Sequence, residues 1–406
     1  MELFRSKTCA LCKGRKHLCG RPRCPILEKF RVAKSVESKI NKKEIFGASP
    51  PSVFVGEFGY PNVRIGPMVP PVEGDTSFMD DPSRWDNISI PEIMEYRSML
   101  VMGETNANVS VNKNSKLLTN IQELAMANKP VDSEIELKKA PKLELITGGF
   151  TPPVGPRESM LKFRLTENPK IPRKSDYIVG DDLKANEGMI SLYDSGFDEY
   201  YIIKLLSTGL LGINKKLVPT KWSITAAQDL LGKHVKKKIL ENNQINDYEV
   251  YFKNFLGNRY AVLLVPDLYA FEMLEVWLKG SLFSGENYQI LGDFEDIAGM
   301  KGYANKITGA FYAGRLSVLE YLKKRKKQAK ILVFREITPE YYAPVGVWQI
   351  RTGVRLAMEN RLGKFNDLKS ALEEIKKYLD VPMKDYETES KILKSNQRQA
   401  TLDKFF

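Results

Sequence analysis

The segment YEVYFKNFLGNRYAVLLV, residues 248–265, carries the clearest fold signal in the chain. Its two halves, Tyr248–Phe255 and Arg259–Val265, alternate apolar and polar residues around Gly257-Asn258, where the glycine permits the positive φ of a tight turn. The pattern predicts a β-hairpin.

The residues after this hairpin predict a mixture of helices and strands. Residues 269–279 place Phe271, Leu274, Trp277 and Leu278 at helical spacing, which predicts a helix. By the same criteria we expect further helices at 303–328, 352–362 and 365–379, and strands at 330–336 and 345–351.

The N-terminal half also mixes both kinds of structure. We expect helices at 26–43, 90–102, 116–128, 190–195, 198–207 and 225–241, and strands at 52–55, 63–65, 142–146 and 160–165. Residues 48–86 are rich in Pro and Gly, so only short strands fit there.

Composition excludes several classes of protein. Hydrophobic residues make up 43% and charged residues 28% of 406 residues, which is ordinary usage for a globular chain. At this length roughly two or three domains are expected. No run of about 18 apolar residues occurs, and the basic N-terminus lacks the apolar region of a secretory signal, so we expect a cytoplasmic protein with no membrane partner. Only His17 and His234 are present, which nearly excludes catalysis by paired histidines.

Positive charge is concentrated at one end of the chain. The net charge is +12, and residues 1–43 contain 13 basic and three acidic residues, a net of +10. The other 363 residues therefore contribute only +2. This distribution predicts a polyanionic partner, most commonly nucleic acid, at the N-terminal end.

All four cysteines lie in CALCKGRKHLCGRPRCP, residues 9–25. The spacing Cys-x2-Cys-x6-Cys-x4-Cys lets the thiolates of Cys9, Cys12, Cys19 and Cys24 close around one tetrahedral ion, which predicts a structural zinc site. An iron–sulfur cluster is the rival interpretation, and His17 is an alternative ligand. The cations between the cysteines are candidate DNA-binding residues, because they can contact phosphates: Lys13, Arg15, Lys16, Arg21 and Arg23.

The last eight residues, QATLDKFF, match the peptide that docks on sliding clamps. Gln399, Leu402, Phe405 and Phe406 follow the pattern Gln-x2-aliphatic-x2-aromatic-aromatic. A single tight turn places Leu402 and both rings on one side as a hydrophobic plug, and leaves Gln399 at the pocket rim. Residues 380–397 are polar with little apolar periodicity, which predicts a mobile tether before this peptide. The alternative is that the rings fold into the protein's own core.

These features define the expected organisation. We expect an α+β fold: a mixed body with an N-terminal zinc module, a helical C-terminal part and a flexible C-terminal tail. Residues 1–43 would form the basic four-cysteine module with its following helix, and residues 380–406 the tether with the clamp-binding peptide.

The zinc motif and the terminal peptide together resemble the archaeal Nre DNA repair proteins. Four internal stretches are similar to that family too: GYPNVRIGPMVPP (59–71), KWSITAAQD (221–229), GAFYAGRLSVLEYL (309–322) and FREITPEYYAPVGVWQIR (334–351). The resemblance spans nearly the whole chain and implies a large N-terminal α+β region, residues 44–285, and a smaller C-terminal region, residues 286–379. It implies a cytoplasmic, chromosome-associated archaeal protein that acts in DNA damage repair with the sliding clamp PCNA. It supplies no catalytic mechanism.

Signatures of known catalytic sites are mostly absent: the chain has no GxxxxGK[ST] loop, no HExxH and no G-x-S-x-G elbow. The remaining catalytic candidates are carboxylates, namely Asp293, Glu295, Asp296, Glu320 and Glu336. Two or three of these could hold Mg²⁺ or Mn²⁺ for phosphodiester cleavage, with Arg315, Arg335 or Arg351 on the phosphate. The alternative, which we favour, is a solvated acidic loop with buried salt bridges.

Two further features have alternative interpretations. The run KKRKKQAK, residues 323–330, is either a solvated helix end or a DNA-contacting patch formed by Lys323, Lys324, Arg325, Lys326 and Lys327. We expect Trp222, Trp277 and Trp348 in the core, although an exposed ring beside Lys221 could stack on an extruded base.

Three functional hypotheses result. The first is a PCNA-recruited DNA repair factor that binds DNA through its zinc end and body. The second is a metal-dependent nuclease or other DNA-processing enzyme recruited in the same way. The third, a zinc-containing RNA-binding factor, leaves the clamp peptide unexplained.

Overall fold

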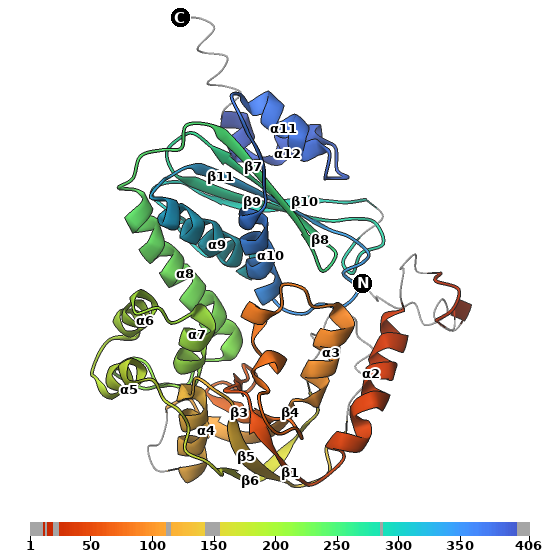
Figure 1. The fold of residues 1–406 in the computed structure, drawn as a ribbon, viewed down its shortest axis with the longest axis vertical. Helices are drawn as coiled ribbons and strands as arrows, with labels where there is room; N and C mark the ends of the chain where they lie inside the picture. Colours follow the sequence, from red (N-terminus) through yellow and green to blue (C-terminus); the bar gives the residue numbers. More distant parts are fainter. Residues whose placement is uncertain are drawn as a thin grey trace, which may run out of the picture. The chain divides into compact units, whose positions relative to one another are not determined.

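A computed structural model describes residues 11–12, 14–18, 24–110, 115–142, 155–284 and 287–395. It contains two six-stranded sheets with helices around them, which confirms the mixed α+β class (Figure 1). The described chain divides into two compact units. We call residues 26–231 the N-terminal unit and residues 232–395 the C-terminal unit.

The N-terminal unit is built on a sheet with strand order β1-β5-β6-β4-β3-β2. Its strands are β1 (Glu44–Ser49), β2 (Val53–Val55), β3 (Asn62–Val69), β4 (Val101–Asn108), β5 (Val131–Leu137) and β6 (Arg157–Leu165). Neighbouring strands are antiparallel except β4 and β6, which are parallel. In β5 every second residue is buried, which is the pattern of a strand with one face in the core.

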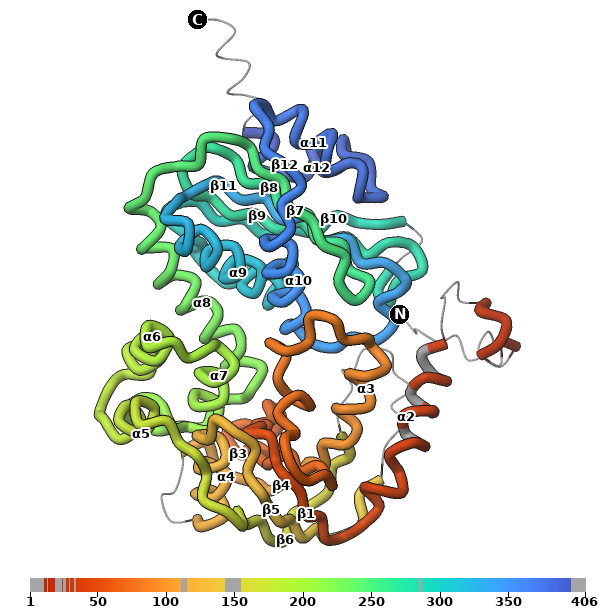
Figure 2. Tube along the Cα trace, in the orientation of Figure 1, coloured from red at the N-terminus to blue at the C-terminus, as the bar shows by residue number. Residues whose placement is uncertain are grey.

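Helices cover this sheet and extend beside it. They are α2 (Pro25–Ile40), α3 (Ile90–Met99), α4 (Lys116–Met126), α5 (Arg173–Gly180), α6 (Ala185–Asp194), α7 (Glu199–Ser207) and the first part of α8 (Thr220–Ile239), with short 3-10 turns at Ser77–Met79 and Pro82–Arg84. α4 contacts β2, β3 and β6, and α7 contacts β2. Figure 2 shows α5, α6 and α7 following one another along the chain, and each contacts the next.

The C-terminal unit contains the second sheet, with strand order β10-β9-β11-β8-β7-β12. Its strands are β7 (Tyr248–Phe255), β8 (Asn258–Val265), β9 (Ala270–Trp277), β10 (Ile290–Glu295), β11 (Lys330–Ile337) and β12 (Arg361–Phe365). Its helices after α8 are α9 (Gly309–Arg325), α10 (Trp348–Glu359), α11 (Leu368–Lys376) and α12 (Met383–Glu389). β11 lies at the centre, parallel to β9 and antiparallel to β8.

Both faces of this second sheet are covered. α9 and α10 lie on one face, and α11 and α12 lie on the other (Figure 1). Leu263, Leu332 and Phe334 pack with Leu372 and Tyr386 in the core on the α11 side. Because neither face meets water, the central strands are buried along almost their whole length.

The predicted hairpin is confirmed, with a shift in its turn. β7 and β8 pair antiparallel from Glu249↔Leu264 to Phe255↔Asn258. Leu256 and Gly257 both take positive φ, +50° and +72°, as in a type I′ turn, so the turn lies one residue earlier than Gly257-Asn258. A Cβ on Gly257 would lie 2.5 Å from the backbone nitrogen of Tyr341, so no other residue fits this position.

Two secondary-structure predictions in the C-terminal unit are wrong. Residues 270–277 form strand β9 and not a helix, because a strand buried on both faces is apolar at nearly every position and so also satisfies helical spacing. Residues 348–351 belong to helix α10 and not to a strand. The helices expected near 26–43, 90–102, 116–128 and 198–207 are confirmed. The strand expected at 142–146 lies largely outside the described residues.

The compact units divide between Leu231 and Gly232, because β7 and β8 share a sheet with β11 and β12. The regions expected at 44–285 and 286–379 stay a prediction. The predicted tether from Asp380 onward is wrong for its first part. Residues 383–389 form α12, residues 391–395 form a helical turn, and the side chains of Tyr386, Ile392 and Leu393 are buried.

Within the part of the chain that the structure describes, no helix is both long enough and apolar enough to cross a membrane.

Candidate functional site

The N-terminal segment presents two of the four predicted zinc ligands among the described residues. Cys12 is buried and Cys24 is half-buried, and both thiols are free of disulfides. Cys9 and Cys19 lie outside the described residues, so the four-cysteine site stays a prediction.

The backbone around Cys12 suits a thiolate. A hydrogen bond from the backbone N–H of Leu18, joined by those of Lys16, Gly14 and His17, outweighs burial and lowers the pKa of the Cys12 thiol. Gly14 takes φ +69°, which helps the chain fold back over the sulfur. A thiolate is the form that binds zinc, so the residues described fit the predicted metal.

The basic residues of this segment are described only in part. Arg15 and Lys16 are exposed, and their backbone N–H groups donate to the Cys12 carbonyl at 3.0 and 3.2 Å. The fold of this turn therefore presents two of the candidate DNA-binding cations to solvent beside a candidate zinc ligand. Lys13, Arg21 and Arg23 lie outside the described residues.

The second basic run, residues 323–330, is partly structural. Arg325 ends α9 and donates from Nη1 and Nη2 to the buried carboxylate of Glu249 at 2.5 and 2.9 Å. Lys327 donates from Nζ to the Gln244 carbonyl at 3.2 Å. Lys324 and Lys326 are exposed, and Lys323 is half-buried. Arg325 is thus held in an ion pair with Glu249 on β7, and its role as a DNA-contacting residue stays a prediction.

This ion pair shifts the titration of both partners. Burial alone would raise the pKa of Glu249, but hydrogen bonds from Arg325 and Tyr251 outweigh burial and leave that pKa lowered. The carboxylate in turn raises the pKa of Arg325. A charged pair with one partner at 1% exposure is a structural contact.

The acidic residues at the end of β10 are bound within the fold. Asp293 accepts hydrogen bonds from the backbone N–H groups of Lys306 and Ile307 at 3.1 and 2.9 Å, which fixes the loop before α9. Asp296 accepts from the backbone N–H of Ala298 at 2.9 Å.

Glu295 is the centre of a buried charge cluster. Its carboxylate accepts from Arg315 Nη1 at 2.7 Å and from the Tyr269 hydroxyl at 2.5 Å, and Lys236 Nζ lies 3.6 Å away. Burial lowers the pKa of Lys236, although Glu295 opposes this shift. The Glu295 carboxylate at the end of β10 is thus connected to three other segments. Lys236 comes from α8, Tyr269 from the residue before β9, and Arg315 from α9.

The remaining candidate carboxylates lie apart from Glu295, on other elements. Glu320 on α9 pairs with Arg355 on α10 at 2.8 Å. Glu336 on β11 accepts from the backbone N–H groups of Asp380 and Val381, both at 2.8 Å, and burial raises its pKa. Among the described residues, no three His, Cys, Asp or Glu side chains are grouped as a metal site would require. Each predicted catalytic carboxylate therefore has an internal structural partner.

The arginines considered as phosphate ligands are also interior. Arg315, Arg335 and Arg351 are 1%, 4% and 2% exposed. Arg335 forms an ion pair with Glu275 and donates to Asn258 Oδ1. Buried guanidinium groups of this kind hold the sheet and its helices together, and none of the three reaches a phosphate on the surface.

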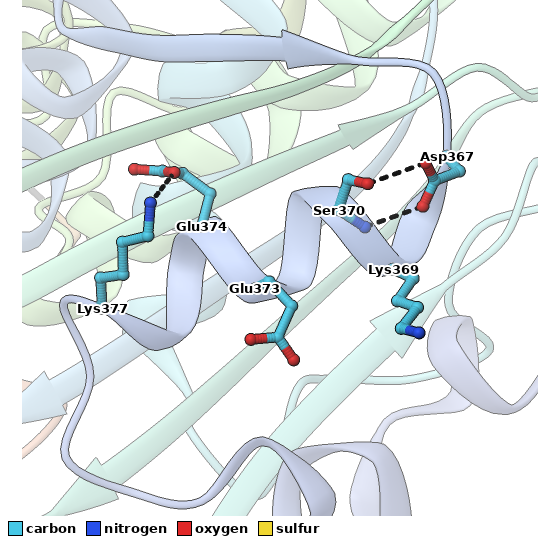
Figure 3. A pocket seen from close by; sticks show the side chains of 6 residues that line it. All are labelled: Asp367, Lys369, Ser370, Glu373, Glu374 and Lys377. Atoms are coloured by element: carbon cyan, nitrogen blue, oxygen red, sulfur yellow. Dashed lines mark hydrogen bonds and ion pairs between the residues drawn. The ribbon is translucent and has the colours of Figure 1, made fainter.

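A shallow hollow on the outer side of α11 is a solvated helix face (Figure 3). Asp367 caps the helix by accepting from the Ser370 backbone N–H and hydroxyl, both at 2.8 Å. Glu374 pairs with Lys377 at 2.6 Å. These polar groups serve the helix itself, as a cap and an i,i+3 pair do on many exposed helices.

The end of the described chain is anchored by one buried carboxylate. Glu272 on β9 accepts from the Ser390 hydroxyl at 2.6 Å and from the backbone N–H groups of Lys391 and Ile392 at 2.8 and 3.0 Å. The last described residue is Ser395. The predicted clamp-binding residues Gln399, Leu402, Phe405 and Phe406 lie outside the described residues.

Sequence reasoning missed one surface feature. Trp222, expected in the core, is 45% exposed, and it lies beside Tyr60, also exposed, with the ring centroids 5.4 Å apart. The two residues come from 59–71 and 221–229, two of the stretches that carried the resemblance. One signal in the sequence could have indicated this surface. Phe58 and Tyr60 lie in a turn that contains glycine, where an apolar side chain has little opportunity for burial.

The family of the chain follows from its similarity to known proteins. A model of the archaeal Nre N-terminal region matches residues 18–284, and a model of the archaeal Nre C-terminal region matches residues 295–405. The chain therefore belongs to the archaeal Nre family.

Relatives of known name cover nearly the whole chain. It is 41% identical to the DNA repair protein NreA of Archaeoglobus fulgidus, over 90% of this chain and 92% of the relative. It is 34% identical to NreB of the same organism, also named a DNA repair protein, over 98% and 99%. The DNA repair protein NreA of Haloferax volcanii is 34% identical, over 87% of each chain. No solved structure matches this chain.

Proposed function

We propose that the protein is a DNA repair factor that binds DNA through its basic N-terminal segment and is recruited by the sliding clamp PCNA through its C-terminal peptide. The observation that carries the proposal is the full-length relationship to proteins named for DNA repair. The two motifs at the chain ends would supply the contacts for that role: basic residues for DNA and a terminal peptide for the clamp. A cytoplasmic, chromosome-associated location follows from the same role.

The N-terminal part of the proposal is supported by charge and local geometry. Residues 1–43 hold +10 of the net charge of +12. Arg15 and Lys16 are exposed beside Cys12, whose thiolate is stabilised by backbone N–H groups. In this proposal zinc, bound by Cys9, Cys12, Cys19 and Cys24, fixes the loop, and the cations between the ligands contact phosphates.

The C-terminal part is supported by the anchor at Glu272. Because Ser390, Lys391 and Ile392 are held on the sheet, the predicted peptide starts a few residues beyond a fixed point on the protein. A short connection gives a high effective concentration of the body near DNA that the clamp encircles. Recruitment then needs only a few anchor side chains at the chain end.

The nuclease alternative receives no support from the described carboxylates. Metal binding at Glu295, Glu320 or Glu336 would require the loss of buried ion pairs or backbone hydrogen bonds. Leaving such partners unpaired costs about 1–3 kcal/mol each, and more where the partner is charged. We therefore favour a role in DNA binding and clamp recruitment over a catalytic role.

The salt dependence of DNA binding tests the N-terminal part. Replacing Lys13, Arg15, Lys16, Arg21 and Arg23 by Gln should weaken duplex binding and reduce the slope of log K against log salt by up to about 0.9 for each phosphate that is no longer neutralised. A matched control replaces Lys369, Lys376 and Lys377 on α11, where Lys376 and Lys377 are exposed and lie near acidic residues. An unchanged affinity and slope would refute DNA binding by this segment.

A further inference from the structure

Three aromatic side chains are exposed together on the N-terminal unit. Phe58, Tyr60 and Trp222 are 88%, 53% and 45% exposed. Phe58 and Tyr60 lie in the turn between β2 and β3, and Trp222 lies in the first turn of α8. The planes of Tyr60 and Trp222 are tilted by 41°, so the two rings do not cover each other. We call these three residues the aromatic surface.

Polar contacts join the start of α8, which carries Trp222, to the segment 55–57. The Trp222 indole N–H donates to Glu57 Oε2 at 3.2 Å, and Lys221 Nζ donates to Glu57 Oε1 at 3.1 Å. The backbone N–H of Val55 donates to Thr220 Oγ1 at 2.9 Å, which joins the start of α8 to β2.

The turn that carries Phe58 and Tyr60 is closed on itself. The Asn62 N–H donates to the Gly59 carbonyl at 2.8 Å, and the Val109 N–H donates to the Pro61 carbonyl at 2.8 Å. Gly59 takes φ +84°, and a Cβ there would lie 2.7 Å from the Asn62 carbonyl oxygen. The backbone of such a fixed turn loses little conformational entropy when a ligand binds to its side chains.

Cations and amides surround the aromatic surface. The side chain of Lys221 is 77% exposed and pairs with Glu57, and that of Arg64 is 67% exposed and pairs with Glu104. Lys216, also exposed, forms a β-bridge with Ser110, next to the residue that binds Pro61. The amides of Asn62 and Asn108 hydrogen-bond each other at 2.9 Å on the same side of β3 and β4. The exposed large apolar side chains of 56–62 and 220–223 are all rings, and none is aliphatic.

This combination favours one class of ligand. Flat rings with exposed cations nearby bind unpaired nucleotides, because every base has a face that can stack and every linkage carries a negative charge. A duplex offers its bases only at groove edges, so stacking on these rings requires unpaired bases.

We propose that the aromatic surface binds unpaired bases of single-stranded DNA by stacking, with Lys216 and Lys221 on the adjacent phosphates. The inference rests on the proposed DNA-binding function and gives it a substrate preference. The basic N-terminal segment contacts phosphates of any DNA, whereas the aromatic surface selects single-stranded regions, gaps or flaps.

The test uses the full-length protein with a fluorescent dT oligomer of roughly 16 nucleotides and a duplex of equal length. Phe58→Ala with Trp222→Ala should weaken dT binding roughly 100-fold, about tenfold for each stacking ring. The slope of log K against log salt should not change, because the rings carry no charge. Duplex affinity should stay within about twofold of the parent protein, since paired bases do not stack on these rings.

Two further variants separate stacking from general apolar contact. Trp222→Phe keeps a flat ring and should retain dT affinity, whereas Trp222→Leu keeps an apolar side chain without a ring and should lose about tenfold. Tyr177→Ala is the matched control, because Tyr177 is 68% exposed on the same unit and should not matter for dT binding. Because the Phe58 side chain is almost wholly in solvent, Phe58→Ala alone keeps the test valid if a Trp222 variant unfolds.

The possible failures are distinguishable. Parent-like dT binding by the folded double variant overturns the stacking inference. Full dT binding by Trp222→Leu also overturns it, because a flat ring would then not be required. If the parent protein binds neither dT nor duplex, the proposed function itself fails. If the parent protein binds both DNAs and the ring variants bind dT as well as the parent does, the proposed function stands and this inference is wrong.

Discussion

Replacing Glu272 by Ala should release the C-terminal end of the described chain from the sheet. The carboxylate is 3% exposed and accepts three hydrogen bonds, from the Ser390 hydroxyl and from the backbone N–H groups of Lys391 and Ile392. It therefore caps the helical turn at residues 391–395 from a different element. In the variant these donors stay buried and have no acceptor.

The size of the effect follows from those hydrogen bonds. An unsatisfied buried donor costs about 1–3 kcal/mol, and hydrogen bonds to a charged acceptor are at the upper end of the range. The three bonds share one carboxylate, so their energies do not add fully. We expect the free energy of local opening to fall by about 2–4 kcal/mol, which corresponds to roughly 30-fold to 1,000-fold faster exchange of protected amides.

Hydrogen exchange of the full-length protein measures this directly. The amides of Ile392 and Leu393 should lose protection, while those of β8 and β11 should keep it. Glu373→Ala is the control, because the Glu373 side chain is 61% exposed and pairs only with Lys376. If exchange at residues 390–395 matches that of the parent protein, Glu272 does not anchor the chain end and the reasoning is wrong.

Three other outcomes are expected. Arg325→Gln should lower the free energy of unfolding by about 3 kcal/mol, because it removes the guanidinium that donates to the buried Glu249 carboxylate and leaves only the more distant cations of Arg361 and Lys364, each 3.9 Å away. Lys324→Gln should change it by less than about 0.5 kcal/mol in a denaturant titration. The pKa of Glu249 is lowered in the folded protein, so its stabilising contribution is present above its ordinary pKa of 4.5 and is lost as pH falls through the lower folded value. The melting temperature of the parent protein should therefore drop more steeply below about pH 4.5 than that of Glu249→Gln, and parallel curves would contradict this. Elemental analysis should find about one zinc per chain, and Cys12→Ser should reduce it; iron with visible absorbance would establish the cluster alternative.

The sequence predicted the parts of the fold that have a single periodicity. The hairpin at 248–265 and α4 have one buried and one polar side, so their patterns are unambiguous. β9 was misread because α9 and α11 cover opposite faces of its sheet, and a strand apolar at every position contains helical spacing by chance. The tether prediction failed because Tyr386, Ile392 and Leu393 are too few to give a periodic pattern, yet they are enough to pack on β9 and β11.

A similar limit applies to the candidate sites, because the sequence shows which residues are charged but not which residues they contact. The partners of the candidate charged residues come from distant segments: Arg325 pairs with Glu249, and Glu336 accepts a hydrogen bond from the backbone N–H of Asp380. Composition cannot distinguish an exposed cation from one in a buried pair. Trp222 shows the same limit for an apolar residue. A large ring is usually interior, but Trp222 is exposed beside Tyr60 of the turn between β2 and β3.

Calorimetric titration of PCNA with the full-length protein measures whether the terminal peptide recruits the protein to the clamp. The parent protein should bind, and Phe405→Ala with Phe406→Ala should abolish measurable binding, because each buried aromatic anchor contributes about 2–4 kcal/mol. Thermal stability, zinc content and DNA affinity of the variant should stay those of the parent. Clamp binding that survives the loss of both rings, or a variant that melts at a lower temperature and still binds the clamp, would contradict the account.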